Sequence, residues 1–185
     1  MKINIKKIAV CAILVALSTV LSLIKIYSLP LGGAITLLSM LPVCLISVMY
    51  GVKYAVLPSF LYASIQLFMS LGEVLSWGLT PAVLVGTIFL DYLLAHGCMF
   101  LAGIWRKKGF AGITLGIALA LICRFTFHFF SGIVLFKSFD VFNNPYLYSL
   151  IYNGSYMLPE IIITVIGAFV LFKSNAITKL INLSE

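Results

Sequence analysis

Four ionisable residues stand within stretches of this sequence that are otherwise apolar enough to lie in lipid: Asp91, Arg124, His128 and Glu160. Arg124 and His128 are four residues apart in "RFTFHFFSG", so a helix would place both side chains on one face. An ionisable group inside a membrane span is energetically costly and usually faces a cavity or a polar partner. We therefore expect these residues to line a polar pocket or to pair with one another.

The depths of these residues in their predicted helices favour a shared pocket. With a rise of ~1.5 Å per residue, Asp91, His128 and Glu160 lie about 13, 12 and 10 Å below the outer helix ends. Arg124 lies one helical turn deeper than His128. Three separate helices thus place a polar group at one level in the outer half of the membrane.

Neighbours on the same helix faces are also suited to binding a ligand. Gly132 continues the face of His128, and its missing side chain would let a flat group approach the backbone. Asn153 and Tyr156 share a face with Glu160 at spacings of three and four. The sequence therefore predicts an outward-facing pocket with carboxylate, imidazole, amide and phenol groups.

The predicted formal charge of this pocket is minus one. Asp91 and Glu160 contribute minus two and Arg124 plus one, with His128 neutral. Such a pocket prefers a monovalent cation, which aromatic rings can hold by cation–π contact. Structural roles remain open for two of these residues. Arg124 can form an ion pair with Asp91 or Glu160, and His128 can form a hydrogen bond between helices. We interpret His96, which has no matching acid, as structural.

The composition is that of an integral membrane protein. Of the 185 residues, 63% are hydrophobic and 9% are charged, whereas soluble domains carry about 25% charged residues. The net charge of +7 does not indicate a nucleic-acid partner, because the basic residues cluster at predicted helix ends. The four cysteines stand singly in apolar runs without metal-ligand spacing, so we expect no metal site.

The hydropathy pattern predicts an all-α fold, a compact bundle of six transmembrane helices in a single domain, 1–185. A span needs about 20 residues, and the segments that meet or approach this length are 6–26, 35–50, 52–71, 82–104, 111–136 and 154–173. The second is the shortest and is expected to be tilted or partly interfacial. The charge-free run 8–24 is too long for a signal peptide, so we expect a retained first helix.

The basic residues predict the orientation. One side holds nine Lys and Arg residues, Lys2, Lys6, Lys7, Lys53, Arg106, Lys107, Lys108, Lys173 and Lys179, and the other only Lys25 and Lys137. Cytoplasmic loops carry the excess of positive charge. We therefore expect both termini to be cytoplasmic and the stretches "SLPLGGA" and "GEVLSWGLTP" to face outward.

Four stretches together resemble a known family: "GGAITLLSMLPVCLISVMYGVKYAVL", "LDYLLAHGCMFLAG", "RFTFHFFSGIVLF" and "YSLIYNGSYMLPEIIIT". They are similar to the thiamine-specific substrate-binding (S) component of energy-coupling factor (ECF) transporters, from about Gly32 to Thr164. The resemblance implies a multi-pass, prokaryotic-type protein of the cell membrane that captures thiamine from outside. It also implies partners, namely a membrane coupling protein and two ATPase subunits, which alone use ATP.

The resemblance also implies a set of ligand-binding residues. The family holds the aminopyrimidine through an acid, a histidine, a tyrosine and an asparagine, which correspond to Asp91, His128, Tyr148 and Asn153, and Tyr92 and Gly132 also line the pocket. Some members stack the thiazolium on two tryptophans, one in the first outer loop and one about a turn beyond the "SG" of "RFTFHFFSG". This chain has no tryptophan in its first outer loop, and it has Phe136 at the second of these positions. Trp77 is a candidate replacement ring.

Ala12 and Ala16 form a small-xxx-small pattern on the first helix, which the wider group uses against the coupling protein. Small residues let helices approach closely, and internal packing is the alternative. The sequence holds no GxxxxGK[ST] phosphate loop, and we expect no catalytic residue and no cofactor. Other hypotheses are capture of a thiamine precursor or another vitamin, a proton-coupled carrier, and an intramembrane enzyme using His128 with Asp91 or Glu160.

Overall fold

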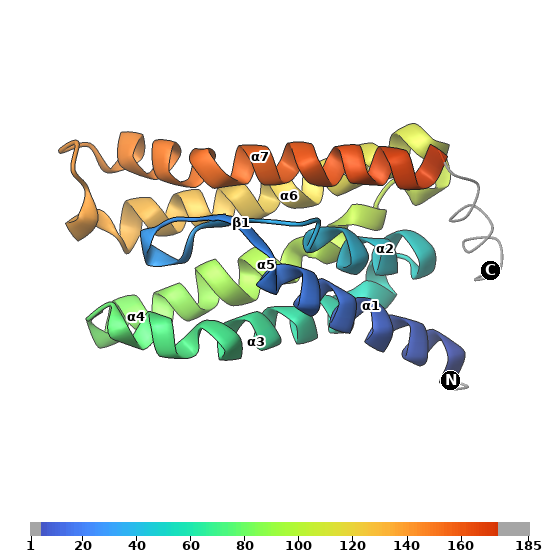
Figure 1. Cartoon of the computed structure of the whole chain (residues 1–185), viewed down its shortest axis with the longest axis horizontal. Coiled ribbons are helices and arrows are strands. Elements are labelled where there is room, and N and C mark those ends of the chain that lie inside the picture. The colour runs from blue at the N-terminus through green and yellow to red at the C-terminus, as the bar shows by residue number, and fades with distance from the viewer. Residues whose placement is uncertain (1–4, 174–185) are drawn as a thin grey trace.

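The computed structural model describes residues 5–173, whose helices run along the long axis of the molecule (Figure 1). In chain order the main elements are α1 (Ile5–Leu23), β1 (Lys25–Ser28), β2 (Ala34–Thr36), α2 (Met40–Tyr50), α3 (Val52–Ser76), α4 (Pro81–Thr87), η2 (Ile88–Leu94), α5 (Ala95–Gly97), η3 (Cys98–Gly103), α6 (Gly109–Val134) and α7 (Pro145–Lys173). Short 3-10 turns connect them: η1 (Pro30–Gly32), η4 (Arg106–Lys108) and η5 (Lys137–Phe139). The run from α4 to η3 is one interrupted helix, so the described residues hold six helical segments.

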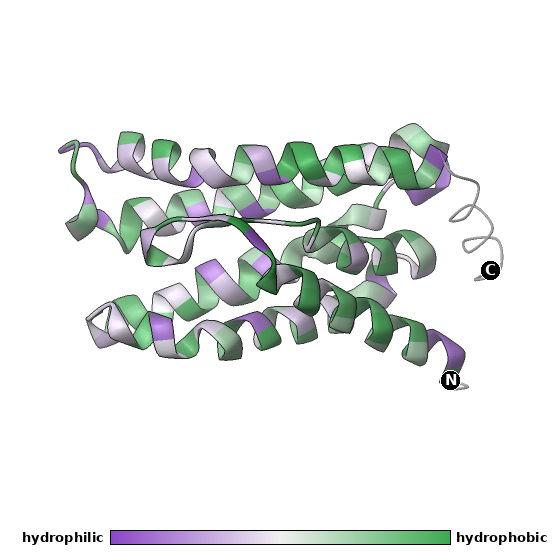
Figure 2. Ribbon diagram, viewed as in Figure 1, coloured by the Kyte–Doolittle hydropathy of each residue, from purple (hydrophilic) through white to green (hydrophobic). Residues whose placement is uncertain are grey.

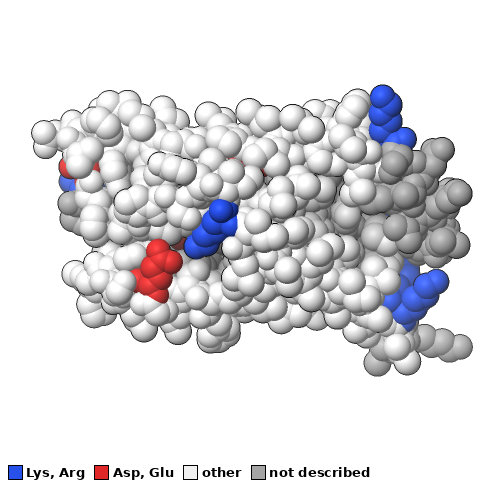
Figure 3. Space-filling model, viewed as in Figure 1, with Lys and Arg blue, Asp and Glu red and all other residues white. Residues whose placement is uncertain are grey.

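Five of these segments are long and apolar enough to cross a membrane: Ile5–Leu23, Val52–Ser76, Pro81–Gly103, Arg106–Val134 and Pro145–Lys173. Many large hydrophobic residues of these segments are exposed, the ribbons are green over much of their length (Figure 2), and the face in Figure 3 is mostly uncharged along the helices. α2 has only 11 residues, which is too short for a bilayer core of about 30 Å. Every residue of α2 except Tyr50 is buried, so it is an interior helix.

Most basic residues of the described chain, namely Lys6, Lys7, Lys53, Arg106, Lys107, Lys108 and Lys173, belong to the end of the molecule where α1 begins and α7 ends, whereas Lys25, Arg124 and Lys137 lie elsewhere. Arg106 donates from Nη1 to the carbonyl oxygens of Val48 and Met49, at 3.2 and 2.6 Å, and so caps the C-terminus of α2. Lys7 Nζ lies 5.2 Å from the ring centroid of Tyr50. This clustering fits the predicted cytoplasmic side, although two residues counted for it, Lys2 and Lys179, lie outside the described residues.

A β-hairpin replaces part of the loop that the sequence analysis expected after the first helix. β1 and β2 pair antiparallel, with Tyr27 opposite Ile35 and Ser28 opposite Ala34. Strands of four and three residues are too short to produce a recognisable alternation of apolar and polar side chains. The fold is therefore helical with one two-stranded hairpin, which lies against the helices in Figure 1.

The last helix begins at Pro145, nine residues before the predicted start at 154, and this boundary was wrong. Proline is favoured at the first helical position because its missing N–H has no partner there. Asn144 Oδ1 accepts a hydrogen bond from Leu147 N at 3.1 Å, which is an N-cap. The polar stretch that looked like loop is thus the start signal of α7. Similarly, α3 continues to Ser76 rather than ending at 71.

The helix that carries Asp91 is irregular. Its central part, η2, is π-helical, and η3 is a 3-10 helix. π-helical turns widen a helix locally and often occur at functional sites. Further along, Ser47 of α2 donates to the carbonyl oxygen of Phe100 and accepts from Gly103 N at 2.9 Å, which fastens η3 to α2.

Candidate functional site

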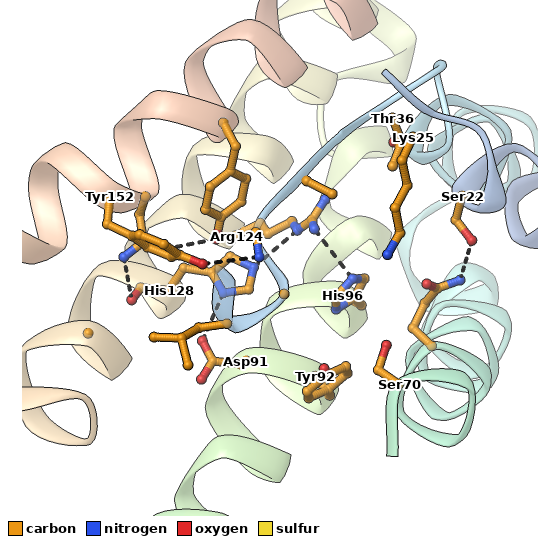
Figure 4. Close-up of a pocket in the computed structure, with 18 of the residues that line it drawn as sticks. Ser22, Lys25, Thr36, Ser70, Asp91, Tyr92, His96, Arg124, His128 and Tyr152 are labelled. Carbon is orange, nitrogen blue, oxygen red and sulfur yellow. Dashed lines mark hydrogen bonds and ion pairs between the residues drawn. The ribbon is translucent and has the colours of Figure 1, made fainter. Parts of the chain in front are cut away.

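A cavity lies between the hairpin and helices α3, η2, α6 and α7 (Figure 4). Its volume is about 120 Å³. Its lining consists of Ser22, Lys25, Leu31, Gly32, Gly33, Ala34, Thr36, Ser39, Met40, Gln66, Ser70, Trp77, Asp91, Tyr92, His96, Arg124, His128, Gly132, Phe136, Tyr148, Tyr152, Asn153 and Tyr156. This mixture of rings and polar groups suits a small organic molecule.

The structure brings together every residue that the sequence analysis assigned to substrate binding. All eight line this cavity: Trp77, Asp91, Tyr92, His128, Gly132, Phe136, Tyr148 and Asn153. Arg124 lines it as well, whereas Glu160 does not. The part these residues take in binding stays a prediction.

A chain of hydrogen bonds crosses the floor of the cavity. Arg124 Nε donates to His128 Nε2 at 3.3 Å, and His128 Nδ1 lies 2.8 Å from Asp91 Oδ1. Because a guanidinium N–H only donates, Nε2 must accept, and the ring proton belongs on Nδ1, from which it donates to Asp91. Ser131 donates to the other carboxylate oxygen of Asp91. Asp91 is therefore held rigidly with its side chain still 16% exposed.

The π-helical turn explains how consecutive residues can both face the cavity. Asp91 points to His128, while the ring of Tyr92 stacks on His96 with centroids 6.0 Å apart and planes at 14°. His96 Nε2 lies 3.4 Å from Arg124 Nη2. His96, interpreted from the sequence as structural, is thus also part of the cavity wall (Figure 4).

Arg124 is not paired with an acid, so the ion pair with Asp91 or Glu160 that the sequence left open is not present. The described residues include no Asp or Glu oxygen within 4.0 Å of its guanidinium, and their ion pair is that of His128 with Asp91. Arg124 is 8% exposed, and its Nη1 has no hydrogen-bond partner among the described residues. Its two side-chain hydrogen-bond partners are imidazole rings, so Asp91 is connected to it only through His128.

Glu160 lies apart from the polar cluster, and its predicted place at the same level was wrong. Because α7 begins at Pro145, Glu160 is fifteen residues, about 22 Å, from the helix start. Its side chain is 2% exposed and accepts two hydrogen bonds from Thr36 of β2, from N at 2.7 Å and from Oγ1 at 2.6 Å. It supports the pocket through the hairpin.

These positions correct the predicted charge of the cavity. Its charged lining residues are Asp91, Arg124 and Lys25, of which Lys25 was assigned only to the outer side. With both histidines neutral the formal sum is minus one plus two, which is plus one, whereas the sequence predicted minus one. The difference arises because Glu160 does not line the cavity, whereas Lys25 of β1 does.

Asn153 holds the facing helices α6 and α7 together. Its Nδ2 donates to His128 O at 3.1 Å and to Ser149 O at 3.0 Å, and its Oδ1 accepts from Tyr156 OH at 2.8 Å. A Cβ on Gly132 would come 2.8 Å from Ser149 Cβ and 3.2 Å from Asn153 Nδ2. Gly132 therefore permits close helix packing, in addition to lining the cavity.

Aromatic rings form the remaining walls. Trp77 meets Phe136 edge to face, with centroids 6.0 Å apart and planes at 73°. Tyr148 and Tyr152 stack at 5.9 Å, and Tyr152 meets Tyr156 at 5.8 Å. Tyr152 also donates from its hydroxyl to the carbonyl oxygen of Pro30 and so fastens the hairpin over the cavity.

Several lining residues were missed from the sequence. A signal existed for Tyr152, because Tyr148, Tyr152 and Tyr156 recur every four residues on one helix face. No sequence signal indicated Lys25, because its side chain lies at the cavity only when the hairpin is folded. Gln66 and Ser70 of α3 also line the cavity, and their spacing of four residues was a further signal that both share one helix face.

Ala12 and Ala16 are exposed on α1. The buried side of this helix is formed by Cys11, Val15, Ser18 and Ser22. The alternative that the two alanines serve internal packing is therefore wrong.

The helices and the cavity define a multi-pass membrane protein that encloses a small-molecule site beneath a hairpin. The sequence matches the family described as thiamine transporter protein (Thia_YuaJ) over residues 8–180. The chain belongs to this family, and it is accordingly a transporter and not an enzyme. The interpretation of His128 with Asp91 or Glu160 as an acid–base pair is thereby excluded.

The proteins similar to this chain include thiamine transporters from two bacteria. Thiamine transporter ThiT of Bacillus subtilis (strain 168) is 28% identical over 176 residues, which cover 87% of each chain. A solved structure of ThiT from Listeria monocytogenes superposes with a TM-score of 0.73 at 20% identity, covering 96% of this chain and 97% of the other. The predicted six-helix membrane fold is confirmed by this match.

Proposed function

We propose that this protein captures thiamine in the cavity beneath the hairpin and delivers it to an ATP-driven ECF module in a bacterial cell membrane. The observation that carries the proposal is the cavity itself, where a positioned carboxylate stands among aromatic rings. Family membership supports the ligand, because the family is that of thiamine transporter proteins. The partners are inferred from the resemblance to S components.

The chemistry of the lining suits the two rings of thiamine. The aminopyrimidine offers N–H donors and ring acceptors, which match the Asp91 carboxylate and the Tyr148 hydroxyl. The thiazolium is a flat cation, which Trp77, Phe136 and Tyr152 can hold by cation–π contact. Asp91 is already held by two hydrogen bonds, so little further ordering is needed on binding.

Calorimetry with purified protein tests the ligand. Thiamine should bind at submicromolar concentration, and the isolated aminopyrimidine half should bind more weakly because it lacks the thiazolium contacts. Absence of thiamine binding at micromolar concentration would overturn the proposal. Tighter binding of the pyrimidine half would instead indicate that a precursor is the ligand.

The energy source is tested by uptake into vesicles. This sequence holds no phosphate loop of the GxxxxGK[ST] type, so the ATP-driven step requires partner subunits. Thiamine uptake should stop when the partner ATPases are inactivated. Uptake that persists without them and follows the proton gradient would indicate a standalone carrier.

A further inference from the structure

A second groove, outside the ligand cavity, lies between the start of α6 and the end of α7. It is lined by Phe110, Phe169, Phe172 and Lys173, so one cation stands beside three phenyl rings. Phe110 and Phe169 meet edge to face, with centroids 5.2 Å apart and planes at 69°, and the two residues are 41% and 46% exposed. The groove is therefore apolar, with a positive charge where α7 ends.

Further cations lie at this end of the molecule. η4, directly before α6, contains Lys107 and Lys108, which are exposed, and Lys173 is exposed as well. Within residues 5–173 none of these three lysines has a carboxylate oxygen within 4.0 Å. On the face in Figure 3, blue side chains and no red ones lie at this end. The groove is thus bordered by basic side chains that no acid of the described chain pairs with.

The groove lies where the helices reach the boundary of the bilayer. It is formed at the ends of two candidate spans, Arg106–Val134 and Pro145–Lys173. Trp105 directly precedes the first of these spans, and tryptophan is enriched at the boundary between membrane and water. The excess of basic residues makes this the predicted cytoplasmic boundary. At this depth an acyl chain would meet the phenyl rings, while a lipid head group would meet the lysines.

The groove also lies away from the surface expected to contact the coupling protein. That surface is the exposed pair Ala12 and Ala16 on α1, and at this end of the molecule α1 and α7 lie at opposite edges of the bundle (Figure 1). A partner that packs against α1 would leave the groove between α6 and α7 facing lipid.

We propose that this groove binds one anionic phospholipid, with its phosphate beside Lys107, Lys108 and Lys173 and an acyl chain along Phe110 and Phe169. Anionic lipids are concentrated in the cytoplasmic leaflet, and basic pockets between transmembrane helices on that side bind acidic head groups. The chain would cover phenyl rings that are otherwise exposed. No residue of the groove lines the ligand cavity, so this site is separate from the one for the transported vitamin.

Native mass spectrometry of the purified full-length protein tests the site. Wild-type protein should bind one phosphatidylglycerol about tenfold more tightly than phosphatidylcholine, whose head group has no net charge. Lys173→Gln should weaken the binding of phosphatidylglycerol about fivefold, since one lysine is lost from the head-group site. Lys173→Arg should keep wild-type binding. Lys53→Gln is the matched control, because it removes an exposed lysine from the same end of the molecule but outside the groove.

A pair of double variants tests the lysines of η4 in the same way. Lys107→Gln with Lys108→Gln should weaken phosphatidylglycerol binding about tenfold. Lys6→Gln with Lys53→Gln removes the same charge from exposed residues of α1 and α3 and should have no effect. Glycerol phosphate, which has the anionic group without acyl chains, should not displace the lipid at equal concentration. Thiamine affinity checks that each variant is folded, since the groove lies outside the cavity.

Four results would overturn the lipid site. Wild-type protein that binds the two lipids equally has no preference for an anionic head group. An equal loss in the groove variants and their controls would indicate diffuse attraction to the basic end. Glycerol phosphate that displaces the lipid at equal concentration would indicate a phosphate site without a chain. A Lys173→Gln variant that no longer co-purifies with the coupling protein, while its lipid preference is unchanged, would assign the groove to that protein.

Discussion

Glu160 of α7 holds Thr36 of β2 through both of its carboxylate oxygens, at 2.7 Å to the backbone N and 2.6 Å to Oγ1. Thr36 Oγ1 in turn lies 2.6 Å from Ser39 Oγ, next to the start of α2. The three residues are buried, and Thr36 and Ser39 line the cavity. Glu160, whose carboxylate the sequence analysis expected in the ligand pocket, therefore holds the hairpin that lies over that pocket.

Weakening this attachment should loosen the hairpin. Glu160→Gln removes the negative charge that accepts both hydrogen bonds from Thr36, so these charge-assisted bonds are weakened at a cost of about 1–3 kcal/mol. We expect faster amide hydrogen exchange at Thr36 and ligand dissociation faster by about tenfold. Glu73→Gln, at an exposed position of α3, is the control. Unchanged exchange at Thr36 would contradict the role given to Glu160.

The polar residues were recognisable from the sequence because ionisable groups are rare in membrane spans. Asp91 and His128 were expected at one level, and they are hydrogen-bonded at 2.8 Å. The prediction worked because both lie inside long helices whose ends were approximately right.

The errors have two sources: a local helix-start signal that was not recognised, and contacts between residues far apart in the sequence. Asn144 and Pro145 together start α7 nine residues early, which moved Glu160 away from its expected depth. The hairpin depends on contacts between distant residues, such as Tyr152 OH accepting from Gly33 N at 3.1 Å, and no short sequence window contains these. The place of Lys25 in the cavity depends on that hairpin, so it could not be predicted.

The carboxylate and imidazole at the cavity floor should both be needed for binding. Asp91→Asn puts an amide group against the His128 Nδ1–H, and His128→Ala leaves Asp91 and Arg124 without their shared partner. Each change should weaken thiamine binding more than tenfold, about 1.4 kcal/mol or more, as measured by calorimetry. Asp140→Asn removes the same charge outside the cavity lining and should have no effect. Unaltered affinity in both cavity variants would show that the cluster is structural.

Trp77 should report on binding by fluorescence. The protein has two tryptophans, and of these Trp77 lines the cavity and Trp105 does not. Thiamine should quench the emission, and the change should vanish in Trp77→Phe and persist in Trp105→Phe. A signal that survives in Trp77→Phe would place the ligand away from this ring.

Gly132 should be needed for the packing of α6 on α7. Gly132→Ala would bring a methyl group to 2.8 Å from Ser149 Cβ, so the helices must separate. We expect a loss of about 1–3 kcal/mol in stability, measured as a lower thermal midpoint in detergent. Gly72→Ala is the matched control, because a Cβ there meets nothing within 4 Å. It should raise the midpoint slightly, since alanine favours a helix by about 0.5–1 kcal/mol. Equal midpoints for the two variants would contradict the packing role.

Variants of Ala12 and Ala16 should distinguish thiamine binding from thiamine transport. Both are exposed on α1, next to the side formed by the buried residues Val15 and Ser18, and neither lines the cavity. If this face contacts the coupling protein, replacing either alanine with tryptophan should prevent the close approach of helices. Uptake of thiamine by cells should then fall sharply, while the purified variant should bind thiamine with wild-type affinity.

The matched control for these variants is Ile13→Trp, because Ile13 is 66% exposed on the same helix and is already large. It should support uptake at a nearly normal rate, which separates a lost contact from a general effect of a new tryptophan in the membrane. Co-purification with the partner subunits should follow the same pattern, lost with Ala12→Trp or Ala16→Trp and kept with Ile13→Trp. Because the alanines lie outside the cavity, a parallel loss of binding and uptake would mean that the tryptophan disturbs the fold. Normal uptake in both alanine variants would show that a different surface contacts the coupling protein.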